Sequence, residues 1–459
     1  MNILISGGTG LVGSELGKAL VTRGHQVFIL TRSKSKANKQ CPFPQSALSY
    51  EELESHPISK SLDHIINLAG ANLTDRRWNS DFKKLIRSSR VQTTEQLVRL
   101  ANDKCPQLKS FVSTSAVGIY GNTGDEIVSE DHPLSYGFLG QVCQDWEAPL
   151  SNLKKDIRPV ILRVGIVFSE KGGALKEMVP PIQAGVGGPL ARGDQFMSWI
   201  DIEDLVNMYV FAIESSIRGT FNAVGLDAQS NTAITQAIAT HLGVKTLMKV
   251  PFFALRMVVG EMAAHLIESQ KISSKKIQDQ GFQFQYRKMQ DSIAKRVPKL
   301  KNMQRRKIYE QWIPKSKEEL FPFFSDAYNL EKITPSNLNF RILSVSSNPV
   351  IEGSLIKYKL RIDGVPVSWT TLIKEWNPPH HFVDNQEKGP YKKWYHFHKF
   401  EELAGGTLMT DQVDLEIPLG KLGFGAASWK VLRDVDKIFK YRRDVIYDMY
   451  CKNNEETSL

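Results

Sequence analysis

Residues 1–13 of the chain, MNILISGGTGLVG, combine an apolar segment with regularly spaced glycines. Residues 2–6 predict a short buried strand, and apolar side chains at helical spacing predict a helix from about residue 11 to residue 23. Glycines in such a turn let a phosphate approach the backbone closely, and the helix N-terminus supplies N–H groups. The stretch therefore predicts a pyrophosphate site, the alternative being a glycine-rich turn without a ligand. Its residues are Gly7, Thr9, Gly10, Leu11, Val12 and Gly13.

The next predicted strand, residues 26–31 (QVFILT), bears on the choice of dinucleotide. In such folds an acidic residue about 20 positions after the glycines binds the ribose 2′-hydroxyl of NAD. Here Thr31 and Arg32 stand at that place, with no acid nearby. A carboxylate would repel a 2′-phosphate, whereas the Arg32 guanidinium can bind it through paired hydrogen bonds. We therefore predict that NADP(H) is preferred over NAD(H); the alternative is that Arg32 is a solvated loop residue.

Length and composition restrict the class of protein. A chain of 459 residues with 41% apolar residues can form two or three domains. Its four cysteines are widely scattered, which favours a reduced cytoplasmic setting, and we interpret Cys143 as a buried structural residue rather than a nucleophile. The first strand leaves no room for a signal peptide, and no apolar run is long enough to span a bilayer. The net charge of +10 is interpreted as a solvated basic surface, not as a nucleic-acid site.

Further strands and a long helix follow in an alternating order. Residues 63–70 (DHIINLAG) predict a strand ending in small residues, which suits a backbone that passes close to a cofactor. Residues 81–102 predict a polar helix, and residues 109–115 (KSFVSTS) predict a strand ending in hydroxyls. Residues 158–168 (RPVILRVGIVF) predict one more strand, with Arg163 in its middle. An arginine in an apolar strand either pairs internally or faces a ligand.

These motifs together resemble the extended short-chain dehydrogenase/reductase superfamily. More narrowly, they resemble its atypical "epimerase family protein" branch, sometimes labelled a cell-division inhibitor. The resemblance covers about the first two thirds of the chain. It implies an α/β fold over residues 1–294, with an NAD(P)-binding Rossmann doubly wound parallel sheet and a smaller substrate-side lobe from about residue 220 to 294. The motifs that carry it include GGTGLVG, INLAGANL, RRWN, SSR, VSTSAVGIYG, LRVGIVF, GGALKEM, GVGGPLARGDQFMSWIDIEDL, GTFNAVG, VPFFALRMVVGEMA and GFQFQY.

The resemblance also implies roles for residues outside the first turn. Thr31 and Arg32 would meet the 2′-phosphate end of the cofactor. Arg90, in the SSR motif, would face the cofactor, and Val167 would lie near the nicotinamide. The adenine and ribose path would be lined by Leu68, Ala69 and Gly70.

The usual catalytic groups of this superfamily are only partly present. Its members use a serine or threonine, a tyrosine, and a lysine four residues after the tyrosine that lowers the tyrosine pKa. Ser115 occupies the serine position by resemblance, but Tyr136 is followed four residues later by Gly140. Three alternatives remain: another proton donor such as Tyr136 or Tyr120, a substrate that needs little acid–base help, or binding of NADP(H) without turnover.

A glycine-rich loop predicts the substrate side of this domain. Residues 185–199 contain several glycines beside Met197 and Trp199, and they precede the acidic run at residues 201–204. Such a loop suits a shaped pocket, although it can equally be a packed turn. We assign a substrate pocket to Arg163, Met197 and Trp199.

The last third of the chain has a different pattern. Residues 295–306 are basic and predict a linker; a nucleic-acid patch is disfavoured because no aromatic residue interleaves with the charges. Residues 307–455 predict a strand, short helices, several antiparallel strands over 339–346, 353–363, 365–376, 391–401 and 407–417, and a long helix over 422–450. This layout resembles the SRPBCC/START-like helix-grip superfamily, an α+β fold. The resemblance implies a curved sheet around a long helix, with a cavity for an apolar ligand.

Aromatic and histidine residues mark the strands of this second domain. Five aromatic side chains either line the cavity or form its packed core. His396 and His398 alternate onto one face of a strand, but two histidines alone do not make a metal site, and no further ligand is evident. We therefore predict no metal. The aromatic residues are Trp369, Trp376, Trp394, Phe397 and Phe400.

The sequence thus predicts a cytoplasmic protein of two domains. Residues 1–294 would form an NADP(H)-dependent oxidoreductase or epimerase for a carbonyl or hydroxyl substrate, and residues 307–455 would bind a hydrophobic small molecule. The alternative is a non-catalytic NADP(H)-binding sensor or regulatory protein. The missing lysine favours the alternative, whereas Ser115 and the glycine-rich loop favour the enzyme.

Overall fold

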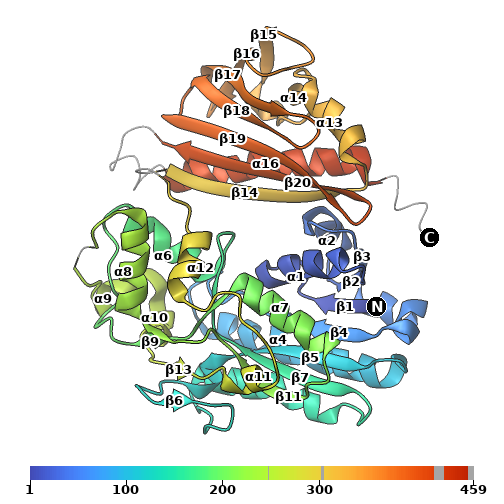
Figure 1. Cartoon of the computed structure of the whole chain (residues 1–459), viewed down its shortest axis with the longest axis vertical. Helices are drawn as coiled ribbons and strands as arrows, with labels where there is room; N and C mark the ends of the chain where they lie inside the picture. The colour runs from blue at the N-terminus through green and yellow to red at the C-terminus, as the bar shows by residue number, and fades with distance from the viewer. Residues whose placement is uncertain (247, 301–303, 418–427, 453–459) are drawn as a thin grey trace. The chain divides into compact units, whose positions relative to one another are not determined.

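The computed structural model describes residues 1–246, 248–300, 304–417 and 428–452 (Figure 1). The chain divides into two compact units. Unit 1 contains Met1–Ala37 and Gln45–Lys299, and unit 2 contains Asn38–Pro44 and Leu300–Leu459. Among the described residues, no helix combines the length and the apolar character that a membrane crossing requires.

The central sheet of unit 1 is parallel, and its strand order is β11-β7-β5-β4-β1-β2-β3. β4 lies beside β1 although β2 and β3 separate them in the sequence. The direction of winding therefore changes between β1 and β4, and the carboxyl ends of these two strands form the usual ligand crevice of such a sheet. This order confirms the predicted doubly wound sheet. The strands are β1 (Asn2–Ser6), β2 (Gln26–Leu30), β3 (Ser46–Leu48), β4 (His64–Asn67), β5 (Ser110–Ala116), β7 (Arg158–Val164) and β11 (Gly219–Ala223).

Helices cover both faces of this sheet. The hydroxyl of Thr114 on β5 is hydrogen-bonded to Tyr209 of α7, whereas Asn67 donates to Thr94 of α4 and to Ser113 of β5. Neighbouring residues of a strand point to opposite faces, so α4 and α7 lie on opposite sides of the sheet. The helices of residues 1–299 are α1 (Leu11–Thr22), α2 (Lys34–Gln40), α3 (Tyr50–Ser55), α4 (Ser80–Lys104), α5 (Phe138–Glu147), α6 (Gly173–Gln183), α7 (Ile202–Glu214), α8 (Asn231–Leu242), α9 (Phe252–Val259), α10 (Ala263–Leu266), α11 (Lys275–Asp279) and α12 (Met289–Arg296). The 3₁₀ helices are η1 (Pro57–Ser61), η2 (Val117–Tyr120), η3 (Ala148–Asn152) and η4 (Gly260–Met262).

The segment 158–168, predicted as one strand, forms two strands. β7 ends at Val164, and β8 (Ile166–Phe168) leaves the main sheet to pair with β10 (Trp199–Asp201). The break falls at Gly165, where a β-carbon would lie 2.3 Å from the carbonyl oxygen of Ser198. A glycine is therefore needed at position 165, where β7 ends and β8 begins. The other short pairs are β9 (Phe196–Met197) with β12 (Gln229–Ser230), and β6 (Ile127–Val128) with β13 (Lys271–Ile272).

A buried ion pair fixes the C-terminal part of unit 1. Asp201 caps α7 by accepting the Glu203 N–H, and its carboxylate also accepts two hydrogen bonds from Arg296 of α12, at 2.8 and 3.1 Å. In unit 2, Arg306 forms a bidentate pair with Asp414, with both contacts at 2.7 Å. The predicted linker, 295–306, was therefore too long at both ends. Its first end belongs to α12 and its last end to β14, where Arg296 and Arg306 pair with carboxylates that are distant in the sequence.

The sheet of unit 2 is antiparallel, in the order β14-β20-β19-β18-β17-β16-β15. The predicted strands are present, and the structure adds β18, which the sequence analysis missed. Figure 1 shows α16 along one face of this sheet, where Val435 and Phe439 pack against Val413 and Leu415 of β20. The strands are β14 (Gln304–Ile313), β15 (Arg341–Val345), β16 (Leu355–Ile362), β17 (Val365–Asn377), β18 (His381–Lys388), β19 (Lys393–Leu403) and β20 (Gly406–Glu416).

The helices of unit 2 follow the sequence prediction where the structure describes them. Ser316 and Glu319 form a capping box at the start of α13. The first part of the predicted terminal helix, residues 422–427, lies outside the described residues, and α16 covers the rest. The helices are α13 (Lys317–Ser325), α14 (Asn329–Lys332), η5 (Ser336–Leu338) and α16 (Ser428–Tyr450).

Candidate functional site

The glycine turn of unit 1 is shaped by close backbone contacts. Gly7 has a φ of +77°, and a β-carbon there would lie 2.8 Å from the carbonyl oxygen of Leu68. A β-carbon on Gly13 would lie 2.4 Å from the carbonyl oxygen of Gly7, so α1 packs directly on the turn. Within the part of the chain that the structure describes, no side chain caps α1 at Gly10, and the first turn of α1 contains no acidic residue. Its first N–H groups therefore remain available to an anion, as a dinucleotide pyrophosphate requires.

The turn lies at the change of winding between β1 and β4, and the other residues predicted in it occupy its rim. Thr9, Leu11 and Val12 are half-buried. The Leu11 side chain lies next to Gly172, in the segment that follows β8. Val167 is in β8, and its carbonyl oxygen approaches Gly173. The structure thus brings the predicted nicotinamide-side residue close to the predicted pyrophosphate turn.

The end of β2 carries the predicted 2′-phosphate site. Thr31 follows β2 directly, and its Oγ1 accepts a hydrogen bond from the Ser33 N–H at 3.1 Å. Arg32 is exposed, and within the described part of the chain it makes no hydrogen bond or ion pair. Its guanidinium is therefore not committed to another protein group.

The loop after β4 is supported by Arg90. Leu68 donates its N–H to the Ser6 carbonyl, and Ala69 donates to the Asn67 side chain. Arg90 donates to the Ala71 carbonyl at 3.1 Å, and its guanidinium lies 5.0 Å from the centre of the Trp146 ring. A β-carbon on Gly70 would lie 2.9 Å from the guanidinium carbon of Arg90. Arg90 therefore supports the backbone of this loop, and Gly70 leaves the space that the guanidinium occupies.

The two predicted catalytic residues are not in contact. Ser115, near the end of β5, is 1% exposed, and its Oγ has no hydrogen-bond partner among the described residues. Tyr136 is 92% exposed, in the segment that precedes α5. Cys143 of α5 is buried, as predicted, and burial raises the pKa of its thiol to about 11, so it is protonated at neutral pH.

The backbone explains why no lysine follows Tyr136. A β-carbon at Gly140 would lie 2.2 Å from the carbonyl oxygen of Ser135. Any side chain at position 140 would force this carbonyl to move. The turn at the start of α5 therefore excludes the lysine that the superfamily usually places there.

Arg163 belongs to the protein interior, so its assignment to a substrate pocket was wrong. Its guanidinium forms a bidentate pair with Glu147, at 2.9 and 2.8 Å, and also donates to the Tyr120 hydroxyl at 2.8 Å. Tyr120 in turn donates to Asn222, and burial raises its pKa to about 12. Of the two alternatives for Arg163, internal pairing is the one that the structure has. The same network engages Tyr120, the second candidate proton donor.

Trp199 is also a core residue, which corrects its assignment to the pocket. It is fully buried, stacks on Phe168 with ring centres 5.6 Å apart, and donates its indole N–H to the Asp227 carbonyl. Met197 is half-buried and accepts a hydrogen bond from Asn231 at its sulfur atom. The glycine-rich loop around these residues is therefore packed on the lobe at these positions.

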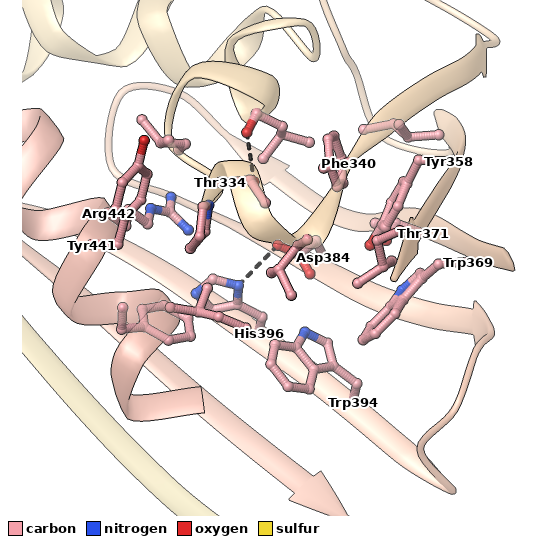
Figure 2. A pocket seen from close by; sticks show the side chains of 18 of the residues that line it. Thr334, Phe340, Tyr358, Trp369, Thr371, Asp384, Trp394, His396, Tyr441 and Arg442 are labelled. Atoms are coloured by element: carbon pink, nitrogen blue, oxygen red, sulfur yellow. Dashed lines mark hydrogen bonds and ion pairs between the residues drawn. The ribbon is translucent and has the colours of Figure 1, made fainter. Parts of the chain in front are cut away.

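Unit 2 contains a cavity of about 590 Å³, within the range of small-molecule sites. Trp369 and Trp394, which line it, lie with ring centres 5.5 Å apart (Figure 2). Trp376 and Phe400 instead belong to a core cluster that includes Phe321. Four of the five predicted aromatic residues are thus divided between cavity wall and packed core, whereas Phe397 is half-buried beside His381, with ring centres 5.4 Å apart.

Two carboxylates contact the predicted histidines, and one of them, Asp384, lines this cavity with both rings. Asp384 Oδ2 lies 3.1 Å from His396 Nδ1 and 2.7 Å from His398 Nε2, and Asp411 Oδ1 lies 3.0 Å from His396 Nε2. Burial lowers the pKa of His396, but the carboxylates outweigh it and raise this pKa, whereas burial and the charge of His396 lower that of His398. The expectation that no further metal ligand is near the histidines was therefore wrong.

Comparison with known proteins identifies relatives of unit 1. Residues 3–223 match the model of the NAD dependent epimerase/dehydratase family, and residues 250–295 match a domain of unknown function, DUF1731. The "Epimerase family protein SDR39U1 homolog, chloroplastic" of Arabidopsis thaliana is 33% identical over 299 residues, which cover 64% of this chain and 86% of that protein.

Two solved structures share the fold of unit 1. The human epimerase family protein SDR39U1 with NADPH is 30% identical, with a TM-score of 0.60, and the match covers 65% of this chain and 100% of that one. A nucleoside-diphosphate sugar epimerase from Corynebacterium glutamicum is 28% identical, with a TM-score of 0.51, and the match covers 65% and 58% of the two chains.

The doubly wound sheet and the glycine turn define a dinucleotide-binding protein of the short-chain dehydrogenase/reductase type. The chain belongs to the NAD-dependent epimerase/dehydratase family, as the sequence motifs predicted.

Proposed function

We propose that unit 1 is an NADP(H)-dependent oxidoreductase or epimerase acting on a small carbonyl or hydroxyl compound. The observation that carries this proposal is the uncapped N-terminus of α1 behind the glycine turn, together with the uncommitted Arg32 at the end of β2. A relative that is 30% identical was solved with NADPH, which supports the choice of cofactor. The scattered cysteines of the chain support a cytoplasmic location.

Different groups of the protein would bind the cofactor and orient the substrate. The N–H groups at the start of α1 would hold the pyrophosphate, and Arg32 would bind the 2′-phosphate. The backbone of Leu68 and Ala69 would line the adenosine. NADP(H) supplies hydride transfer when bound, and the Ser115 hydroxyl, whose oxygen makes no well-oriented hydrogen bond among the described residues, would donate to the substrate oxygen.

Turnover on ordinary carbonyl compounds should be slow, because no lysine assists proton transfer. General acid–base help is typically worth about 10²–10⁴ in rate. We expect Ser115→Ala to lower the rate of NADPH oxidation about 10²-fold, as does the loss of other donors to a reacting oxygen. Tyr136→Phe should lower it too if the exposed tyrosine closes over bound substrate as the proton donor. Stopped-flow measurements with a panel of carbonyl compounds test both variants.

An exposed tyrosine of unit 2, Tyr328, provides a control for this experiment. Tyr328→Phe should leave the rate unchanged. If Ser115→Ala and Tyr136→Phe also leave it unchanged, neither residue takes part in the reaction. No oxidation with any compound, despite tight NADPH binding, would favour the second candidate, a non-catalytic NADP(H)-binding regulator. The close contact between position 140 and the Ser135 carbonyl favours that candidate, because it excludes the lysine.

We also propose that unit 2 is a helix-grip module of the SRPBCC/START-like type that binds a hydrophobic small molecule. An antiparallel sheet packed by the long helix α16 and a cavity lined by Trp369 and Trp394 support this proposal. The cavity volume of about 590 Å³ is appropriate for one small molecule.

We expect a fragment of residues 300–459 to fold alone, unfold cooperatively and increase the fluorescence of an apolar probe. A second fragment, residues 307–459, provides a matched comparison because it lacks Arg306 and with it the bidentate pair to Asp414. This shorter fragment should unfold at lower denaturant concentration, since Asp414 is 5% exposed and would lose its partner. Two fragments that are both insoluble would contradict the proposed boundary.

A further inference from the structure

The histidines and carboxylates of unit 2 are brought together by strand register. Asp384 on β18 is directly opposite His396 on β19, and Asp411 on β20 is directly opposite His398. His396 and His398 are two residues apart in one strand, so both rings point to the same face of the sheet. The ring centres are 3.7 Å apart, and the two rings lie between the two carboxylates. We call these four residues the histidine–carboxylate cluster.

On one side of the rings, three potential ligand atoms converge. Asp384 Oδ2, His396 Nδ1 and His398 Nε2 belong to a group whose ligand atoms all lie within 4.8 Å of one another. The carboxylate oxygen lies 3.1 and 2.7 Å from the two nitrogens, which are hydrogen-bond contacts. Ligands about 2.0–2.2 Å from a tetrahedral zinc ion lie somewhat farther apart, so an ion that replaces the bridging proton needs only a small outward shift of these side chains. All three residues line the cavity, where Figure 2 shows Asp384 and His396 side by side.

On the other side of the rings, Asp411 faces the remaining ring nitrogens. Its Oδ1 lies 3.0 Å from His396 Nε2 and 2.8 Å from His398 Nδ1, although the latter nitrogen makes no well-oriented hydrogen bond among the described residues. Arg442 lies 3.9 Å from the same carboxylate. Histidines that bind metals usually donate their second N–H to a carboxylate in this way, which fixes the ring and leaves the first nitrogen for the ion.

The charge of the cluster also suits a cation. With neutral histidines, the two carboxylates carry two negative charges and Arg442 carries one positive charge. This leaves one negative charge in a site where all members but the half-buried Asp384 are buried. Either a divalent cation or a proton on one histidine would compensate this charge. The cluster thus has two possible states, a metal site and a protonated hydrogen-bond network, which an experiment can distinguish.

We propose that Asp384, His396 and His398 bind one divalent transition-metal ion at the wall of the cavity. Two imidazoles and one carboxylate form a ligand set typical of zinc or iron sites with open coordination positions. Those open positions face the cavity, so an oxygen or nitrogen atom of the bound small molecule would complete the coordination. Asp411 acts as a positioning residue that orients both rings.

Cobalt is the probe for this site, because Co²⁺ in a protein nitrogen and oxygen environment absorbs visible light. The full chain is stripped with a chelator and titrated with CoCl₂, and ZnCl₂ is then added in competition. We expect one equivalent of Co²⁺ to bind with a visible spectrum that Zn²⁺ abolishes. Asp384→Asn and His396→Gln should each weaken binding at least 100-fold, whereas Asp411→Asn should weaken it about 10–100-fold and keep the same spectrum.

His381→Gln is the matched control, because His381 lies on β18 outside the cluster. It should bind Co²⁺ like the unmodified protein. Absence of stoichiometric binding to the unmodified protein would overturn the proposal and leave the protonated network. Binding that persists unchanged in Asp384→Asn and His396→Gln would also overturn it. If these variants fail to fold, X-ray absorption of the unmodified zinc-loaded protein decides, since fewer than two imidazole ligands would contradict the assignment.

Discussion

Glu147→Gln should destabilise unit 1 by about 3–5 kcal/mol, because it removes one partner of a buried ion pair. The side chains of Arg163 and Glu147 are 6% and 13% exposed, and two hydrogen bonds join them. In the variant, the guanidinium keeps its charge in the interior with only a neutral amide, the Tyr120 hydroxyl and the Glu130 carbonyl around it. Denaturation monitored by circular dichroism measures the loss in the transition that belongs to unit 1.

Two further variants complete this experiment. The double variant Glu147→Gln with Arg163→Met removes both charges and should recover much of the loss, because replacement of a whole buried pair is often neutral. Asp279→Asn disrupts an exposed pair, Lys275–Asp279, and should cost less than about 1 kcal/mol. A loss below about 1 kcal/mol in Glu147→Gln would show that the pair does not stabilise the interior.

Arg32→Ala should weaken NADPH binding while NADH binding stays unchanged. A hydrogen-bonded contact to a charged group contributes about 1.5–3 kcal/mol, which corresponds to roughly a 10–150-fold loss of affinity. Arg32 makes no hydrogen bond or ion pair within the described residues, so its removal should not disturb the fold. Fluorescence titration of both cofactors against the variant provides the two dissociation constants.

The control for this titration is Arg23→Ala, which makes the same change of charge. Arg23 follows the last residue of α1, whereas the predicted cofactor site lies at the first residues of this helix. The two ends of such a helix lie at opposite edges of the sheet, so Arg23 is far from the cofactor. Its loss should change the affinity for NADPH less than threefold. Equal losses of affinity for NADPH and NADH in Arg32→Ala would mean that Arg32 does not bind the 2′-phosphate.

The parts of unit 1 that the sequence predicted correctly depend on local patterns. A strand, a glycine turn and a helix follow one another within residues 1–23, so periodicity and glycine spacing suffice to predict them. Arg163 and Trp199 were misassigned because their environment is nonlocal. The partner of Arg163 is 16 residues away on α5, and the glycine-rich segment before Trp199 gives no indication that its end enters the core.

The cluster in unit 2 was missed for a related reason. Strand β18, HFVDNQEK, lacks the regular alternation of apolar and polar residues that predicts a strand, so Asp384 had no predicted position in the sheet. The two histidines were recognised as neighbours on one face, because that follows from their spacing alone. Their carboxylate partners depend on the register of three strands, which no short stretch of sequence specifies.

The contact at Gly140 has a consequence for anyone who wishes to redesign this protein. A single substitution to lysine would place a β-carbon against the Ser135 carbonyl, 2.2 Å away. Directed evolution toward a faster reductase would therefore have to lengthen or redirect the turn before α5 first, and only then introduce the lysine. The backbone before α5 must change before the usual tyrosine–lysine pair can form. Libraries limited to point changes at position 140 should therefore not produce a faster reductase.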